Sequence, residues 1–384
     1  MLPRPALVAE MRRLLRSHPV VALVGARQVG KTTLAHEVAA QQSGPVEVFD
    51  LENADDVARL AEPLPALSPL RGLIVLDEIQ RRPEIFPTLR VLADRPRRPA
   101  RFLVLGSASP DLLRQASETL AGRIAYLHVA GFSVEEVGPS HLDRLWLRGG
   151  FPRSFLARSD QESLRWRRGF VQTFLERDIP QLGIGVPSAT LRRFWNMLAH
   201  YHGGVWNASE LARSFGVSDH TVGRYLDALV GTFMVRRLAP WHENLGKRQV
   251  KAPKVYLTDS GILHALLGLG TARDVAVHPR VGASWEGFMI EEVVRRLRAE
   301  PEECFFWATH MGAELDLLVV RGTRRLGFEV KHTTAPSVTR SMHVALEDLR
   351  LDRLDVIHRG THTFPMGDRI RAVAASKIVE DVTS

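Results

Sequence analysis

Three features are scarce or missing in this chain of 384 residues: cysteine, long apolar runs and an apolar block near the N-terminus. The single cysteine, Cys304, cannot form an internal disulfide, so we expect a protein of the reducing cytoplasm. No apolar run approaches the roughly 20 residues that span a bilayer, so we expect no membrane partner. Residues 1–5 lead into no apolar block, which argues against a signal peptide.

Short internal repeats and long low-complexity tracts are also missing, so we expect ordinary globular domains. The length predicts two to four of them, and 45% apolar with 24% charged residues is typical of such proteins. The net charge of +8 favours a polyanionic partner such as DNA. However, arginine far outnumbers lysine, and a genome rich in G and C would produce the same bias. Charge by itself therefore leaves a DNA partner open.

Apolar runs typical of buried strands occupy the first third of the chain. They are residues 20–24, 46–51, 73–76, 102–105 and 124–129. Helix-like stretches separate most of these runs, a pattern that predicts a parallel α/β sheet. From about residue 136 the strand signals fade and arginine-rich helical patterns follow, such as residues 162–177. A second helical block precedes one more helix and two short strands near the C-terminus.

A phosphate-binding loop follows the first apolar run. Its letters, GARQVGKT, match the pattern GxxxxGK(S/T), and a helical pattern follows at residues 33–40. In such a loop, glycines let backbone N–H groups surround phosphates, and the new helix adds the positive end of its dipole. Lys31 would reach the β- and γ-phosphates of ATP, and Thr32 would bind magnesium. The expected nucleotide contacts are Gly25, Ala26, Arg27, Gln28, Val29, Gly30, Lys31, Thr32 and Thr33.

Two carboxylates follow the apolar run at residues 73–76. In a parallel sheet, ligands bind at the C-terminal ends of the strands. Asp77 would therefore hold magnesium, mostly through water, and Glu78 would orient and deprotonate the attacking water. An apolar run that ends in Asp-Glu is commonly only a strand end, but its pairing with the phosphate loop favours the catalytic interpretation.

Two later positions could contact the γ-phosphate. Ser107 follows the run at residues 102–105, Ser109 is nearly as good, and a serine that only forms a turn is the competing interpretation. Arg123 could neutralise charge in the transition state, in its own subunit or in a neighbour's. A plain surface arginine is the alternative in a chain so rich in arginine.

These motifs and several later ones resemble a family of bacterial and archaeal AAA-type ATPases with a C-terminal domain of unknown function. The shared segments are GARQVGKTT at 25–33, LIVLDEIQ at 73–80, LAGR at 120–123, RGGFP at 148–152, FLERDIP at 174–180, KAPKVYLTDSGIL at 251–263 and EVK at 329–331. They cover nearly the whole chain in the expected order. The phosphate loop is generic, whereas LERDIP and PKVYLTDSG are more distinctive.

The resemblance implies four domains. They are a P-loop ATPase domain at residues 1–135, a helical lid at 136–187, a winged helix-turn-helix at 188–270 and a restriction-endonuclease-like domain at 271–384. In this arrangement Arg177 of the lid would reach the γ-phosphate, and the lid would pass the change to the winged-helix region. We further expect self-association into a ring, such as a hexamer.

A helix, a glycine turn and a second helix are predicted independently at residues 209–230. Ser218 would cap the second helix, and Val222, Leu226 and Leu229 would form its apolar stripe. The side chains on its outer face, available to a DNA groove, are His220, Thr221 and Arg224. Basic residues follow where a wing would touch phosphates, namely Lys247, Arg248, Lys251 and Lys254. A packing unit or a protein-contact module is the alternative.

An aspartate followed by Glu-x-Lys on the next strand is predicted near the C-terminus. Asp316 and Glu329 could hold a second magnesium ion through oxygen ligands, and Lys331, on the same strand face as Glu329, could polarise the attacking water. Glu286 lies on the apolar side of a helix over residues 285–297, where a buried carboxylate needs a partner. Because Glu-x-Lys is common and usually structural, a relic that only binds DNA or protein is the alternative.

Three hypotheses of function follow from these patterns. The first is an ATP-driven, oligomeric motor or remodeller that acts on DNA, including branched DNA. The second is an ATP-gated, metal-dependent DNA nuclease, and the third is an ATP switch that binds protein partners without a DNA role. The basic charge, the helix-turn-helix pattern and the nuclease-like end together favour the first.

Overall fold

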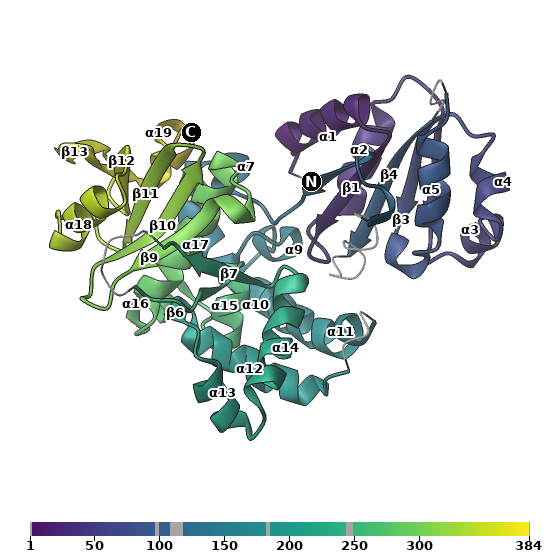
Figure 1. Cartoon of the computed structure of the whole chain (residues 1–384). Coiled ribbons are helices and arrows are strands. Elements are labelled where there is room, and N and C mark those ends of the chain that lie inside the picture. Colours follow the sequence, from purple (N-terminus) through teal and green to yellow (C-terminus); the bar gives the residue numbers. More distant parts are fainter. Residues whose placement is uncertain (1, 97–99, 108–117, 182–184, 243–248, 384) are drawn as a thin grey trace. The chain divides into compact units, whose positions relative to one another are not determined.

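The computed structural model describes residues 2–96, 100–107, 118–181, 185–242 and 249–383 (Figure 1). The chain divides into two compact units. The first comprises Met1–Gly131 together with Gly231–Phe233, and the second comprises Phe132–Val230 and Met234–Ser384. Within the described ranges, no helix is both long enough and apolar enough to cross a membrane.

A fully parallel sheet with the strand order β2-β3-β4-β1-β5 forms the centre of the first unit. Its strands are β1 (Val20–Gly25), β2 (Val46–Asp50), β3 (Gly72–Asp77), β4 (Ala100–Ser107) and β5 (Ile124–His128). Each of the five apolar runs contributes one strand, so the predicted parallel α/β sheet is confirmed. Because β1 and β3 both flank β4, the residues that follow their carboxyl ends meet at one edge of the sheet.

Helices connect these strands and cover the sheet. They are α1 (Pro5–Ser17), α2 (Lys31–Ala40), α3 (Ala54–Arg59), α4 (Pro63–Leu67) and α5 (Ile85–Ala93), with a 3-10 turn η1 (Ile79–Arg81). Phe86 and Leu89 of α5 belong to the same buried cluster as Ala22 of β1 and Ile74 of β3. Alternate strand residues thus point into one apolar core, while the carboxyl edge of the sheet remains available for polar chemistry.

The second unit begins with a run of helices. They are α7 (Val134–Val137), α8 (Leu142–Arg148), α9 (Pro152–Phe155), α10 (Asp160–Thr173) and α11 (Ile179–Gln181), with a 3-10 turn η2 (Pro139–His141). Between α10 and α11 the FLERD segment forms a π-helical turn, η3 (Phe174–Asp178). A π-helical turn is a rare backbone conformation, and where one occurs it often lies at a functional site. This distinctive segment therefore has an unusual backbone.

Two of the distinctive segments pack on each other in the second unit. Asp259, in TDSG, accepts hydrogen bonds from the backbone N–H groups of Gly150 (2.7 Å) and Ile262 (2.8 Å). A Cβ atom at Gly149 would lie 2.1 Å from Asp259 Oδ1, and one at Gly261 would lie 2.1 Å from the carbonyl oxygen of Arg148. Only glycine fits at both positions, so one glycine of RGGFP and the glycine of TDSG allow these two segments to pack closely on each other.

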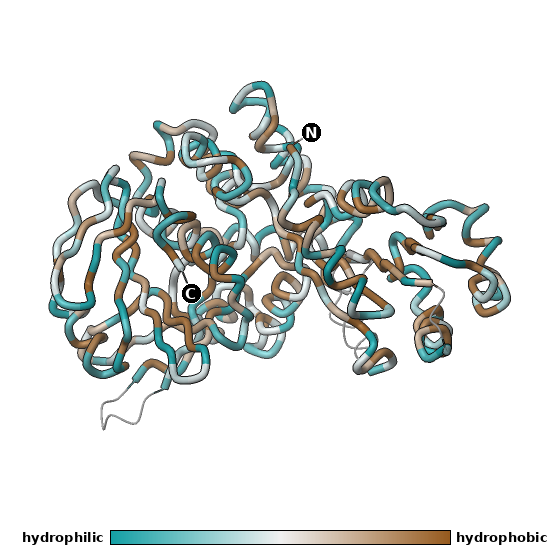
Figure 2. The backbone as a smooth tube through the Cα atoms, turned by 90° about the horizontal axis from the view of Figure 1, so that it is seen from above, coloured by the Kyte–Doolittle hydropathy of each residue, from teal (hydrophilic) through white to brown (hydrophobic). Residues whose placement is uncertain are grey.

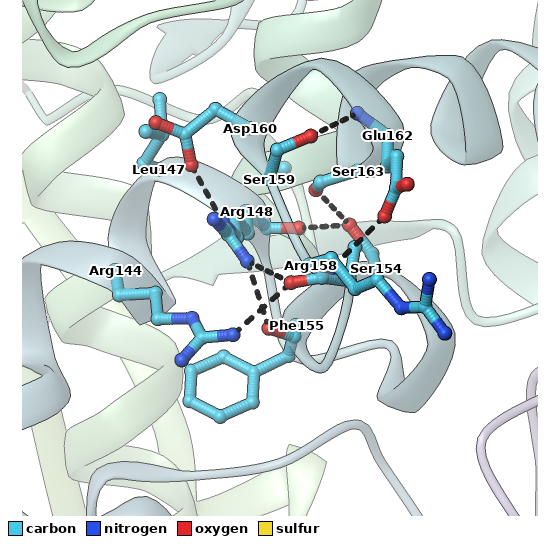
Figure 3. A network of polar contacts seen from close by, with 12 residues as sticks. Arg144, Leu147, Arg148, Ser154, Phe155, Arg158, Ser159, Asp160, Glu162 and Ser163 are labelled. Atoms are coloured by element: carbon cyan, nitrogen blue, oxygen red, sulfur yellow. Dashed lines mark hydrogen bonds and ion pairs between the residues drawn. The ribbon is translucent and has the colours of Figure 1, made fainter.

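Arg148 is fixed from its other side by polar contacts along α8 and α10 (Figure 3). Its Nε donates to Asp160 Oδ1 over 2.7 Å, and its Nη1 donates to the carbonyl oxygen of Ala157 over 2.6 Å. The Ser154 hydroxyl donates to the Arg148 carbonyl oxygen over 2.6 Å and lies 2.8 Å from the Ser163 hydroxyl. The network links α8, α9 and the start of α10 through hydrogen bonds.

Three further helices and three strands follow. The helices are α12 (Ser188–Tyr201), α13 (Ala208–Phe215) and α14 (Asp219–Gly231), and the strands are β6 (Gly204–Val205), β7 (Val235–Pro240) and β8 (Lys254–Leu257). Gly216 ends α13 in the left-handed region at φ +65°, and Ser218 accepts a hydrogen bond from the Thr221 N–H before α14. Hydrophobic and hydrophilic stretches alternate along the helices (Figure 2), as expected where one face is buried.

The strands of the second unit form one sheet with the order β13-β14-β12-β11-β10-β9-β7-β8-β6. The strands are β9 (Cys304–Ala308), β10 (Glu314–Arg321), β11 (Arg324–Lys331), β12 (Arg353–His358), β13 (Phe364–Gly367) and β14 (Ile370–Ala374). The remaining helical elements are α15 (Ser260–Leu266), α16 (Ala272–Val277), α17 (Val281–Leu297), η4 (Pro301–Glu303), α18 (Arg340–Asp348), η5 (Ala375–Lys377) and α19 (Ile378–Asp381). Since β7 pairs in parallel with β9, hydrogen bonds cross the domain boundary expected at residue 270.

Candidate functional site

The phosphate-binding loop lies between β1 and α2 in the first unit. A Cβ atom at Gly25 would lie 2.0 Å from the carbonyl oxygen of Val129, so the chain can turn here only at glycine. Gly30 has φ +98° and caps α2, whose first residue is Lys31. The first N–H groups of a helix have no partner within that helix, so the loop offers them to an anion.

Lys31 is folded onto the loop itself. Its ammonium group donates to the carbonyl oxygens of Gly25 (3.0 Å) and Ala26 (2.9 Å). Burial lowers the pKa of Lys31 to about 8, and the nearby carboxylates of Glu78 and Asp77 oppose part of that shift. A phosphate group would supply the negative charge that stabilises this buried ammonium.

The two expected magnesium ligands lie side by side. Thr32 Oγ1 donates a hydrogen bond to Asp77 Oδ2 over 2.7 Å, which joins the start of α2 to the end of β3. A hydroxyl and a carboxylate oxygen are both ligands that magnesium accepts. The pair therefore fits a magnesium ion, and the loop beside it fits the phosphates of a nucleotide. The remaining loop residues, Arg27, Gln28, Val29 and Thr33, lie in the same turn and first helical residues.

Glu78 lies directly after Asp77 and has an unusual backbone for a non-glycine residue, with φ +57°. Its N–H donates to Asp77 Oδ1 over 2.8 Å, and the side-chain amide of Gln80 donates to its carboxylate. Burial raises the pKa of Glu78, while the Gln80 hydrogen bond and the Arg27 charge lower it. A carboxylate with a raised pKa beside the phosphate site is suited to accept a proton from water.

Sequence reasoning missed two residues of this site. The side-chain amide of Gln80 donates to the Glu78 carboxylate. Its position two residues after Glu78 was the one sign in the sequence that it could reach this carboxylate. Arg4 is buried, and its guanidinium donates to the carbonyl oxygens of Val29 and Gly131, each over 3.3 Å. Nothing near Arg4 in the sequence indicated that this residue, directly before α1, would contact the phosphate loop.

The other candidates for γ-phosphate contact have mixed positions. Ser107 is the last residue of β4 and pairs in register with Gly25, but its side chain and all of Ser109 lie outside the described residues. Arg123 forms a two-pronged ion pair with Asp94 at the end of α5, over 2.6 and 3.0 Å. Arg177 is exposed on η3 of the second unit. The catalytic roles of Ser107, Arg123 and Arg177 stay predictions.

The residues predicted to contact DNA belong to the second unit. His220 and Arg224 are exposed on α14, whereas Thr221 is half-buried and its hydroxyl lies 2.9 Å from that of Ser218. Lys251 is exposed, and Lys247 and Arg248 lie outside the described residues. Lys254 was expected to touch phosphates beside them, but this expectation is wrong because its side chain is only 5% exposed and bonded to carboxylates.

The carboxylates predicted near the C-terminus gather around strands β10 and β11. Asp316 and Glu329 are both buried, and burial raises the pKa of each. Lys331 opposes this shift at Glu329, and the charge of Glu286 on α17 adds to it at both residues. The N–H of Val330 donates to Asp316 Oδ2 over 2.8 Å, and Lys331 bonds to Glu329 Oε1 over 2.6 Å. Glu286, Asp316, Glu329 and Lys331 thus act on one another at one site, and the sequence pattern grouped the same four residues.

Two residues that precede this cluster in the chain complete it. The Lys254 ammonium lies 3.3 Å from Glu286 Oε1, and the Tyr256 hydroxyl donates to the same oxygen over 2.5 Å. Across the described parts of the chain, no three His, Cys, Asp or Glu side chains are placed to hold a metal ion. Binding of a second magnesium ion by Glu286, Asp316 and Glu329 stays a prediction.

Comparison with protein-family models matches three consecutive parts of the chain. Residues 17–138 match an AAA domain, residues 139–273 match a domain of unknown function (DUF8612), and residues 281–378 match another domain of unknown function (DUF4143). The second unit therefore contains the two parts for which no function is assigned.

Similar proteins are known from mycobacteria and from an archaeon. The uncharacterized proteins Rv2008c of Mycobacterium tuberculosis and Mb2031c of Mycobacterium bovis are each 52% identical over 371 residues, which cover 97% of this chain and 83% of theirs. Among solved structures, the Walker-type ATPase PABY2304 of Pyrococcus abyssi has a TM-score of 0.50 at 15% identity. The match covers 70% of this chain and 96% of that one, and it concerns the fold alone.

Proposed function

The chain belongs to the AAA-type ATPases that carry C-terminal domains of unknown function, and we propose that it uses ATP hydrolysis to move or remodel DNA. The ATPase part of this statement rests on the AAA domain, whose P-loop fold implies nucleotide binding. The action on DNA and the assembly into a ring are the proposed part.

The proposed ATP site assigns a distinct role to each side chain. Lys31 would leave the carbonyl oxygens of Gly25 and Ala26 and bind the β- and γ-phosphates of ATP. Thr32 and Asp77, already in contact, would hold the magnesium ion, which when bound offsets the negative charge of the phosphates. Glu78 would accept the proton of the attacking water, since its carboxylate lies at the same sheet edge as Asp77.

The proposal of DNA contact is carried by the outer face of α14. His220 and Arg224 are exposed there, and Lys251 is exposed just before β8. A helix that follows a short turn after another helix presents such side chains to a DNA groove in many DNA-binding proteins. The net charge of +8 supports a polyanionic partner in the same direction.

ATP turnover of the wild-type chain tests the proposal. It should be measured beside Lys31→Ala and Glu78→Gln, with no DNA, with duplex, with single strands and with a four-way junction. We expect one DNA form to stimulate the wild type, and both variants to lose turnover on every form. Turnover that no DNA changes would favour the third hypothesis, a switch with protein partners.

A binding experiment separates a specific surface from general basic charge. Arg224→Ala should weaken DNA binding and reduce the slope of log affinity against log salt by about one contact. Arg153→Ala is the matched control, because Arg153 is also an exposed arginine of the second unit but lies on α9. Equal loss in both variants would show that the net charge, and not α14, attracts DNA.

An ATP-gated nuclease remains the second candidate function, since one observation favours it. Glu286, Asp316, Glu329 and Lys331 come from three separate elements and influence one another's charge at one site, in which Asp316 and Glu329 are buried. Metal-dependent nicking of DNA that Asp316→Ala abolishes would establish this activity. Absence of nicking at any magnesium or manganese concentration, with ATP and without it, would count against this activity.

A further inference from the structure

Lys254 lies at the centre of the carboxylate cluster rather than at the surface. It is the first residue of β8, its side chain is 5% exposed, and it pairs through its backbone with Leu238 of β7. Its ammonium group lies 3.3 Å from Glu286 Oε1, 4.0 Å from Asp316 Oδ1 and in direct contact with Glu314. One ammonium group thus connects helix α17 and strand β10, which both follow Lys254 in the sequence.

The charges of the cluster nevertheless do not balance. Among the described residues, four carboxylates contribute to it, namely Glu286, Glu314, Asp316 and Glu329, whereas Lys254 and Lys331 supply two ammonium groups. Glu329 is 6% exposed, and its Oε2 atom has no hydrogen-bond partner among the described residues. A buried carboxylate oxygen without a partner is costly, so the cluster has room for further positive charge.

A divalent ion could meet that demand only by displacing the ammonium. Oxygen ligands bind magnesium at about 2.0–2.1 Å, which requires the carboxylates to converge on one point. The Lys254 ammonium lies 3.3 Å from a Glu286 oxygen and 4.0 Å from an Asp316 oxygen, so its charge stands beside both carboxylates and would repel a second cation there. The ammonium group also lies 5.6 Å above the ring of Phe306, a further favourable contact for a cation.

We propose that Lys254 is the resident cation of this cluster and keeps divalent metal ions out of a site formed by Glu286, Asp316 and Glu329. The proposal does not depend on DNA binding or on the ATPase cycle. The contact of Lys254 with α17 and β10 would then inhibit metal binding by the protein's own chain, and the pairing of β8 with β7 holds Lys254 in that contact. Movement of β8 away from α17 would open the cluster to a metal ion.

Manganese binding to the full-length, nucleotide-free protein tests this proposal. Lys254→Met removes the charge and keeps a side chain of similar length that tolerates burial. We expect this variant to bind one more manganese ion than the wild type, at least about tenfold more tightly than any site of the wild type, because a repelling charge is gone. Lys254→Met combined with Glu329→Gln should lose the added ion. Lys251→Met, an exposed lysine three positions earlier, should behave as the wild type does.

Two results would overturn the proposal. One is a folded Lys254→Met variant that binds no additional manganese. The other needs no lysine variant, so it stays decisive if Lys254→Met fails to fold. Wild-type protein that binds manganese at the cluster, with loss of that ion in Glu329→Gln alone, would show that Lys254 and a metal ion coexist.

Discussion

The side-chain amide of Gln80 donates a hydrogen bond to the carboxylate of Glu78. Glu78 itself is held in the left-handed region at φ +57°, a backbone state that costs a non-glycine residue on the order of 1–3 kcal/mol. The Gln80 bond, the Asp77 acceptor for the Glu78 N–H and the 3-10 turn η1 that follows all hold this geometry. Gln80 is therefore a positioning residue for the carboxylate that we assign to proton transfer.

Gln80→Ala should lower kcat of ATP hydrolysis several-fold and leave KM nearly unchanged, because the residue orients the Glu78 carboxylate. The pH profile gives a sharper readout. The Gln80 hydrogen bond lowers the pKa of Glu78, against the larger effect of burial, so its loss raises that pKa further. Since Glu78 acts only when ionised, the acidic limb of the rate profile should move to higher pH. Gln42→Ala, an exposed glutamine at the end of α2, should move neither quantity.

The Arg123–Asp94 ion pair allows the arginine-finger prediction to be separated from a structural role. Arg123→Ala removes both the ion pair and the arginine, whereas Asp94→Ala removes the ion pair and keeps the arginine. If Arg123 stabilises the transition state, ATP turnover should fall by at least about tenfold in Arg123→Ala and stay near the wild-type rate in Asp94→Ala. Both variants should unfold at nearly the same urea concentration as the wild type, because an ion pair in contact with solvent contributes little to stability. Equal loss of turnover in both would make the pair structural.

The contact between Gly261 and the Arg148 carbonyl oxygen predicts a large effect of one methyl group. Gly261→Ala would place a Cβ atom 2.1 Å from that oxygen, which demands a backbone shift and should cost roughly 1–3 kcal/mol or more of unfolding free energy. Gly169→Ala is the matched control, since Gly169 lies within α10 and no atom lies within 4 Å of its added Cβ. That change should stabilise the protein by up to about 1 kcal/mol. Urea unfolding of both variants measures their free energies of unfolding. Equal changes in the two variants would contradict the close packing of Gly261 on the Arg148 carbonyl oxygen.

Two adjacent glutamates of α17 should respond oppositely to pH. Burial raises the pKa of Glu292 to about 7, above that of the unfolded chain, so its stabilising effect is complete at low pH and is lost as pH rises toward 7. Glu292→Gln should remove up to about 3 kcal/mol of this pH dependence. Unfolding free energies of the wild type and Glu292→Gln between pH 5 and pH 8 measure it, and parallel curves would contradict the shift.

Glu291 provides the control with the opposite sign. Burial would raise its pKa, but the Arg236 guanidinium, bonded over 2.5 and 3.0 Å, outweighs burial and lowers it. Its contribution is therefore present near neutral pH and is lost as the pH falls. Glu291→Gln should destabilise the protein at pH 7 by about 3–5 kcal/mol, because a buried guanidinium loses its charged partner.

The sequence by itself determined the parallel sheet of the first unit and the place of its phosphate loop. Both depend on local patterns: apolar runs of strand length, and a glycine-rich turn between a strand and a helix. Thr32 and Asp77 could be paired from the sequence because the carboxyl ends of parallel strands meet at one edge. The glycine turn before α14 could also be predicted from the sequence, because Gly216 and Ser218 act on their immediate neighbours.

Only the tertiary structure decided which distant side chains meet. The basic residues before β8 suggested an exposed wing, but pairing of β7 with β9 brings Lys254 into the carboxylate cluster instead. Arg4 reaches the phosphate loop, and Asp259 reaches Gly150, through contacts that no local pattern encodes. The reason is physical: a residue's backbone propensity and spacing act over a few positions, whereas burial and charge partners depend on how the whole sheet is assembled.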